Sequence, residues 1–115
     1  MPTIGSPGWR SIRISTCRGD PAYIFHFIEC LTAAAQSAGL PPQTAKLLAM
    51  QTVFGAASLV AESGEEPRVL REQVTSPNGT TAAALSVLMG GDRLKTLVTE
   101  AVAAARLRSE ELGRS

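Results

Sequence analysis

The chain has 115 residues, of which 44% are hydrophobic and 18% charged, and its formal net charge is +1. This length suits one domain with one core, and the apolar fraction is too high for a disordered chain. The balance of eleven basic against ten acidic residues excludes nucleic acid and acidic membrane surfaces as first-choice partners. No run approaches the roughly 20 apolar residues that span a bilayer, so we expect a soluble globular protein with no membrane partner.

Residues that could hold a metal or act as nucleophiles are scarce. Cys17 and Cys30 are the only cysteines and His26 is the only histidine, whereas a zinc site usually needs four ligands. We therefore predict no metal site and interpret all three as packing residues. His26 lies in an apolar stretch without a serine nucleophile motif, which argues against Ser-His-Asp catalysis. The few cysteines and the lack of a signal-peptide pattern predict a cytoplasmic location.

The first 19 residues differ in character from the rest of the chain. Two prolines and three glycines interrupt them, and three arginines are their only charges. We predict an irregular N-terminal arm over residues 1–19, in which Ile12 and Ile14 could form a short strand. Residues 20–115 are rich in alanine and poor in alternating Val, Ile and Thr, which predicts a single all-α domain.

Two long helices are expected first. Asp20 and Pro21 suit a helix start, and apolar residues at spacings of three and four then run to a stop at Gly39. Proline at position 42 begins the second helix, which ends near Gly64. Its apolar residues cover more than one stripe. We therefore expect burial on two faces, either deep in a bundle or against a second subunit.

Three further helices complete a predicted bundle of about five. The third is short, begins at Pro67 and carries Val74. The fourth runs from Ala82 to Met89 and is stopped by a glycine pair. The fifth follows Asp92, which is expected to cap it, and carries an apolar stripe until its charged tail over residues 106–115 becomes a solvated helix end.

The segment from Ser76 to Thr81 is the strongest candidate for a binding site. It combines hydroxyl side chains, an Asn-Gly turn and a helix start. The first N–H groups of a helix have no internal partner, so they can bind a carboxylate or phosphate without a basic side chain. Gly79 would let the backbone turn and a ligand approach closely. The structural alternative is that Ser76, Asn78 and Thr80 only cap the helix.

Residues 67–88 read PRVLREQVTSPNGTTAAALSVL. This segment resembles the signature of pyrroline-5-carboxylate reductase, the final enzyme of proline biosynthesis. Upstream, PAYIF from Pro21, FIECL from Phe27 and QTVFGAA from Gln51 resemble the first helices of that family's C-terminal domain. Downstream, residues 106–112 resemble its last helix. The similarity covers roughly residues 21–112.

The resemblance implies a fold, an assembly and a chemistry. The fold is the helical domain of the 6-phosphogluconate dehydrogenase C-terminal-like type, which interleaves with a second copy to form a homodimer that can assemble further. Family members reduce the C=N bond of Δ1-pyrroline-5-carboxylate, a small imino acid, with NADPH or NADH. Carried over, Ser76, Gly79, Thr80 and Thr81 would bind the substrate carboxylate. The Thr81 hydroxyl would serve as the catalytic contact to the ring nitrogen.

The cofactor side of the family pattern differs in this chain. Arg18, Gly19 and Asp20 stand where the family has Gly-Ser-Gly beside the nicotinamide, so the cofactor-binding residues are unknown. No G-x-G-x-x-G motif follows a strand. We therefore expect no cofactor on this chain alone, and no activity without a cofactor domain, whether the chain is truncated, frame-shifted or a separate subunit. One alternative is a non-catalytic helical oligomerisation module. Another is a helix-turn-helix DNA-binding protein, although the chain lacks the basic face that such a protein needs.

Overall fold

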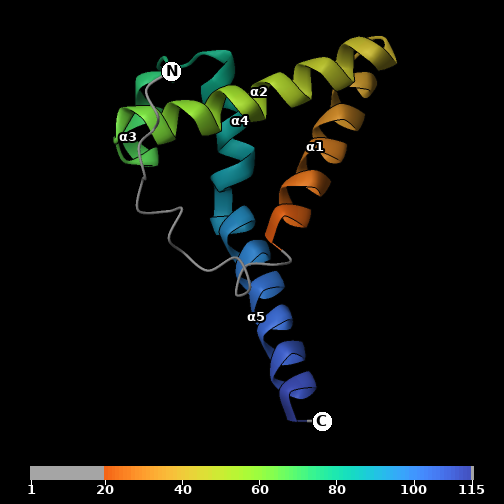
Figure 1. Ribbon diagram of the computed structural model, residues 1–115. Helices are drawn as coiled ribbons and strands as arrows, with labels where there is room; N and C mark the ends of the chain where they lie inside the picture. The colour runs from red at the N-terminus through yellow and green to blue at the C-terminus, as the bar shows by residue number, and fades with distance from the viewer. Residues whose placement is uncertain (1–19, 115) are drawn as a thin grey trace. The chain divides into compact units, whose positions relative to one another are not determined.

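The computed structural model describes residues 20–114, and every regular element among them is helical (Figure 1). They form five α-helices and one 3-10 turn, which confirms the all-α prediction for the described residues. The predicted arm lies outside them, so it stays a prediction, as does the single domain over residues 20–115. The chain divides into two compact units, residues 1–66 and 67–115. The elements are α1 (Asp20–Ser37), α2 (Pro42–Ser63), α3 (Pro67–Gln73), α4 (Thr80–Met89), η3 (Gly90–Asp92) and α5 (Arg93–Arg114).

The first unit is a hairpin of α1 and α2, and its turn is built around Gly39. The Gly39 N–H donates to Gln36 O at 2.9 Å and the Leu40 N–H donates to Ala35 O at 3.1 Å. Gly39 has a φ of +111°, which a residue with a Cβ adopts only at a cost. This is a Schellman ending, and it satisfies carbonyls that the last helical turn leaves free. The predicted stop of the first helix is confirmed.

Helix α2 begins at Pro42 and is followed by Gly64 in the left-handed region, as its sequence predicted. Its buried residues are Ala45 and Ala49, at 0% and 1% exposure, and no other described residue is buried. Their spacing of four places both on one side of the helix. On α1, the half-buried residues include Leu31 and Ala35. On α2, the side chains buried in the hairpin are therefore small ones.

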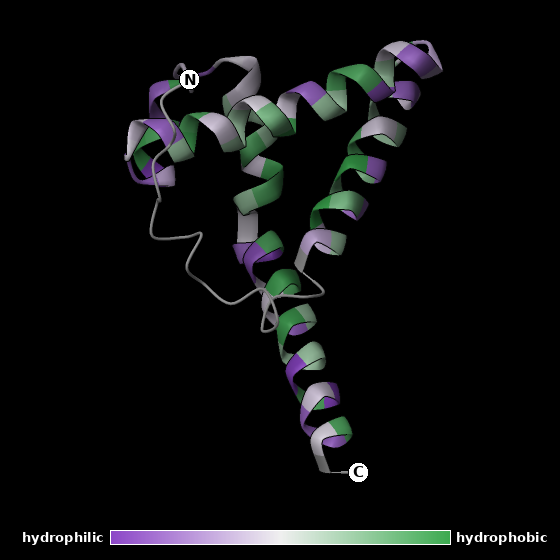
Figure 2. Ribbon diagram, viewed as in Figure 1, coloured by the Kyte–Doolittle hydropathy of each residue, from purple (hydrophilic) through white to green (hydrophobic). Residues whose placement is uncertain are grey.

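The opposite side of α2 is also apolar, and no described residue of the first unit buries it. Leu47, Met50 and Phe54 lie about 140–200° around the helix from Ala45, at about 100° per residue. They are 58%, 44% and 68% exposed, and we call them the far face of α2. The apolar residues of this helix therefore lie on more than one side, but the expected burial of the second side is not seen within the single chain, and its burial against a second subunit stays a prediction. Figure 2 shows hydrophobic residues along both α1 and α2.

The apolar character of α2 corrects one expectation from the sequence. By length and composition alone, the helix over Pro42–Ser63 could cross a membrane. No apolar run of that length was expected from the sequence. Only 11% of its apolar window is buried. Helices that pack on two sides within an assembly meet the same criterion, because they too carry apolar residues around their circumference.

The second unit contains a short helix and two longer ones that follow one another through a glycine turn. Helix α3 ends at Gln73, so Val74 is outside it and 66% exposed, contrary to the prediction. Helix α4 begins at Thr80, two residues before the predicted start. It ends at Met89, where Gly91, with a φ of +63°, redirects the chain into α5. The predicted glycine stop is confirmed.

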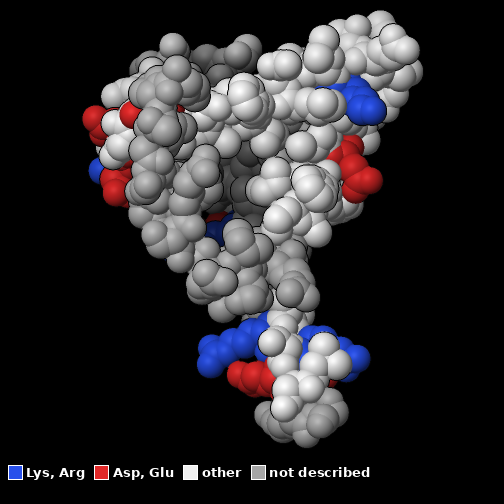
Figure 3. Space-filling view, in the orientation of Figure 1, with Lys and Arg blue, Asp and Glu red and all other residues white. Residues whose placement is uncertain are grey.

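Two features of α5 test the sequence interpretation further. The prediction that Asp92 caps this helix is wrong: its φ is +54°, whereas a capping residue usually lies in the extended region, and its carboxylate accepts no hydrogen bond from a described residue. The tail is helical and solvated as predicted. Ion pairs join Arg106 to Glu110 at 3.2 Å and Arg108 to Glu111 at 3.2 Å. Figure 3 shows both signs of charge mixed there.

Candidate functional site

The turn before α4 is held by bonds within its own unit. The Gly79 N–H donates to Ser76 O at 3.0 Å. Asn78, the third residue of this turn, has a φ of +63°, and Pro77 occupies the second position, which is the residue pattern of a type II turn. Upstream, the Thr75 hydroxyl donates to Arg71 O at 2.6 Å and so ties the turn to the end of α3.

The turn leaves a group of backbone donors free at the start of α4. The first backbone bond into this helix is donated by the Ala83 N–H to Gly79 O at 3.1 Å. The N–H groups of Thr80, Thr81 and Ala82 therefore have no backbone acceptor in the part of the chain that the structure describes. Together they present partial positive charge at the helix start, which favours a carboxylate or phosphate. Of these three donors, Thr80 and Thr81 are expected from the sequence, whereas Ala82 is not.

The capping alternative does not hold in the structure. The N-cap of α4 is Gly79, which has no side chain, and no side-chain hydrogen bond caps the helix. The hydroxyls of Ser76, Thr80 and Thr81 have no hydrogen-bond partner among the described residues, and all three residues are exposed. Polar groups that do not cap the helix remain available to a ligand.

Gly79 is needed for space rather than for backbone freedom. Its φ of −88° and ψ of −177° are extended values that any residue adopts. A Cβ at this position would lie 3.2 Å from Ser76 O, closer than ordinary van der Waals contact. The positive φ of the turn is carried by Asn78 instead, which tolerates the left-handed region better than most residues. The expectation that Gly79 itself makes the turn is thereby corrected.

Two further residues of the turn region were missed from the sequence. Thr75 and Arg71 fix the direction in which the chain leaves α3, through the hydroxyl-to-carbonyl bond described above. Arg71 is half-buried, and its Nη1 lies 3.6 Å from the Met89 Sδ of α4. A threonine just after a short helix is the only signal that could have indicated this link, because such hydroxyls often bond to a carbonyl four residues back.

Outside the turn, the interpretation of His26 and Cys30 as packing residues is wrong for the described chain. Both are exposed, because they lie on the side of α1 that does not pack against α2. Cys17 lies outside the described residues. Among residues 20–114 no three histidine, cysteine or acidic side chains gather as metal ligands would.

Comparison with known proteins defines the class of this chain: an all-helical dimerisation domain of an oxidoreductase. Residues 13–112 match the family model described as pyrroline-5-carboxylate reductase dimerisation. The chain belongs to this family, and the resemblance seen in residues 67–88 is confirmed.

The curated relatives are much longer than this chain. The pyrroline-5-carboxylate reductase of Arabidopsis thaliana is 50% identical over 95 residues, which cover 83% of this chain and 34% of that protein. The enzyme of Synechocystis is 46% identical and 35% of it is covered. The chain thus spans about a third of the length of the curated relatives it matches.

Solved structures show the same helical fold. A pyrroline-5-carboxylate reductase from Coxiella burnetii superposes with a TM-score of 0.77 at 46% identity, covering 82% of this chain and 34% of that one. The Plasmodium falciparum pyrroline carboxylate reductase, solved with NADP bound, gives a TM-score of 0.78 at 34% identity, covering 96% and 41%. The roles of Ser76, Gly79, Thr80 and Thr81 stay predictions.

Proposed function

We propose that this chain is the dimerisation and substrate-binding domain of a pyrroline-5-carboxylate reductase and that it pairs with a second copy of itself. Membership of the dimerisation family supports this proposal most directly. The far face of α2 supports it independently, since an exposed apolar surface on a long helix favours a protein partner. The occupant that the family favours is a second copy.

The proposed substrate site is the turn before α4. The free N–H groups of Thr80 and Thr81, with the Ser76 hydroxyl, hold the carboxylate of Δ1-pyrroline-5-carboxylate. This needs no basic side chain, because the donors and the helix dipole stabilise the negative charge. The Thr81 hydroxyl then bonds the ring nitrogen, orients the C=N bond and stabilises the protonated ring. Gly79 keeps the backbone close enough for this contact.

The cofactor in this proposal is NADPH or NADH, which supplies the hydride that reduces the C=N bond to give proline. The described residues contain neither a glycine-rich nucleotide loop nor a parallel sheet to carry one. They therefore offer no recognisable fit to the nucleotide, and the chain of 115 residues alone binds substrate without reducing it.

A cytoplasmic location belongs to the same proposal, and cell fractionation would test it.

A binding experiment tests the substrate site. L-proline, the product, carries the same carboxylate and ring, so we expect it to raise the melting temperature of the purified chain as its concentration rises. Pyrrolidine, which lacks the carboxylate, is the matched control and is expected to cause a smaller shift. Equal shifts from both compounds, or none from either, would contradict the carboxylate site.

An oligomerisation experiment separates the two halves of the proposal. Light scattering on the purified chain is expected to give the mass of a dimer or of a higher assembly of dimers. A stable dimer that binds no proline would favour the alternative of a non-catalytic oligomerisation module. Adding a separate cofactor domain with NADPH and substrate tests the separate-subunit alternative, for which NADPH oxidation should require both polypeptides.

A further inference from the structure

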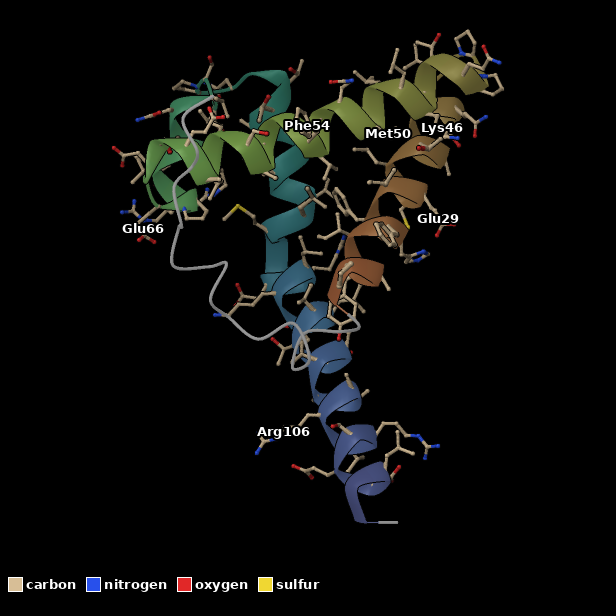
Figure 4. All side chains as sticks on the ribbon, in the orientation of Figure 1. Glu29, Lys46, Met50, Phe54, Glu66 and Arg106 are labelled. Carbon is tan, nitrogen blue, oxygen red and sulfur yellow. The ribbon has the colours of Figure 1, made fainter. Side chains whose placement is uncertain are left out.

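Helix α1 carries a nucleophile, a base and a carboxylate in contact with one another, outside the proposed substrate site. The Cys30 Sγ lies 3.5 Å from His26 Nε2, and His26 Nδ1 lies 2.9 Å from Glu29 Oε1. Their spacing along the chain is three and four residues, so a regular helix alone brings them together. Figure 4 shows Glu29 projecting outward from α1.

The carboxylate determines which nitrogen of His26 faces the thiol as a base. An ionised Glu29 can only accept a hydrogen bond, so His26 Nδ1 must be the donor to it. In the neutral ring the other nitrogen, Nε2, is then the acceptor, and it is the atom nearest the Cys30 sulfur. A nucleophile beside a base, which is itself oriented by a third group, is the arrangement that activates cysteine.

The cluster lies on the open side of α1. At about 100° per residue, Glu29, His26 and Cys30 fall within about 100° of arc, whereas the half-buried Leu31 and Ala35 lie on the other side of the helix. His26 and Glu29 side chains are each 75% exposed, and Cys30 is exposed as well. Among the described residues of the first unit, α2 therefore leaves the sulfur accessible to a small reagent.

We propose that Cys30 is a modification site that undergoes thiol–disulfide exchange with a small disulfide such as oxidised glutathione. The Cys30 thiol gives its proton to His26 Nε2, and the thiolate attacks one sulfur of the disulfide. The S–S bond of the reagent breaks as the new S–S bond forms at Cys30. The leaving glutathione thiolate takes the proton from His26. Glu29 is a positioning residue, because it acts on the sulfur only through His26.

The expected acceleration is modest because two effects oppose each other. His26 Nε2 lies 3.5 Å from the sulfur, so it can take the thiol proton directly, whereas a cysteine without a neighbouring base must pass its proton to water. A stabilised thiolate is also less nucleophilic, which offsets part of the gain. We expect Cys30 to react about three times faster than a cysteine exposed on the same helix without a histidine.

The experiment uses the full chain with Cys17→Ser, so that Cys30 is the only thiol. Its rate of mixed-disulfide formation with oxidised glutathione is followed by mass spectrometry at pH 7. The matched control carries Cys17→Ser, Cys30→Ser and Ser37→Cys, which moves the thiol to another exposed position of α1. His26→Gln should lower the rate to that of the control, and Glu29→Gln should lower it by a smaller factor.

The comparison between Cys30 and the control at residue 37 requires no change at His26, so it holds even where a His26 variant folds poorly. In urea the two thiols should react at equal rates, because the cluster depends on the helix. Equal rates in the native protein would overturn the proposal. A native Cys30 that does not react at all would also overturn it, since the sulfur would then be covered. Neither result bears on proline binding.

Discussion

The far face of α2 allows a quantitative prediction for Phe54→Ala. A phenylalanine side chain covers about 200 Å² when fully buried, so the part of Phe54 that a partner could cover is roughly 140 Å², given its exposure of 68%. Alanine keeps the Cβ, and the lost apolar area of about 100 Å² is worth about 2.5 kcal/mol at 25 cal/mol per Å². A symmetric dimer contains this residue twice.

We therefore expect Phe54→Ala to weaken dimerisation by about 2 to 5 kcal/mol, which raises the dissociation constant about 30-fold to several-thousand-fold. Sedimentation velocity over a range of concentrations measures this change. Gln51→Ala is the matched control on the same helix, because it is exposed but removes little apolar surface. At concentrations where both variants are dimers, circular dichroism should show equal helix content, since the substitution removes side-chain surface and leaves the helix backbone intact. Unchanged dimer affinity in a well-folded Phe54→Ala protein would refute the assignment of a second copy to this face.

Four further changes test the site and the packing. Thr81→Ala should weaken proline binding by about 0.5–1.5 kcal/mol, measured by calorimetry, and Thr81→Ser should restore most of it; equal affinities would contradict the assignment. Gly79→Ala should also lower this affinity, because the new Cβ meets Ser76 O at 3.2 Å; a normal affinity would show that the turn can relax. A Cβ at Gly55 would meet no atom within 4 Å beyond its own helical turn, so the effect of Gly55→Leu should appear in dimer affinity by sedimentation; unchanged affinity with lower helix content would point instead to a contact within the chain. Gly39→Ala should cost about 1 kcal/mol in the free energy of unfolding, because of the φ of +111°, and an unchanged urea midpoint would contradict the strain.

Helix boundaries could be predicted where the residue at the boundary has only one common structural role. Proline at position 42 can begin a helix but not continue one, and Gly39 and Gly64 adopt the left-handed backbone that ends the two long helices. Asp92 was mispredicted because aspartate suits both a helix cap and a left-handed turn residue, and the preceding glycines determine which one occurs. Local composition does not contain that information.

The sequence names the residues of the candidate site, whose roles stay predictions, but it does not give their geometry. The motif indicates that Ser76, Thr80 and Thr81 bind a ligand, but polar residues at these positions could equally cap the helix that follows. Only the backbone conformation, with a side-chain-free cap at Gly79, separates the two interpretations. Gly55 illustrates the opposite limit: a glycine among alanines is typical of close helix approach, yet a Cβ at this position would meet no atom of the described residues within 4 Å beyond its own helical turn. From the sequence alone, a glycine that allows a helix of a second subunit to approach cannot be distinguished from one that allows a helix of the same chain to approach.

The two buried alanines of α2 have a consequence for how the protein folds. Alanine burial contributes little free energy beside that of the larger apolar side chains that stay exposed in the hairpin. Under the proposed pairing, folding and association then become a single bimolecular event, and the monomer has no stable folded state. The melting temperature would rise with protein concentration. Newly made chains would depend on meeting each other, so low expression alone could leave this protein unfolded.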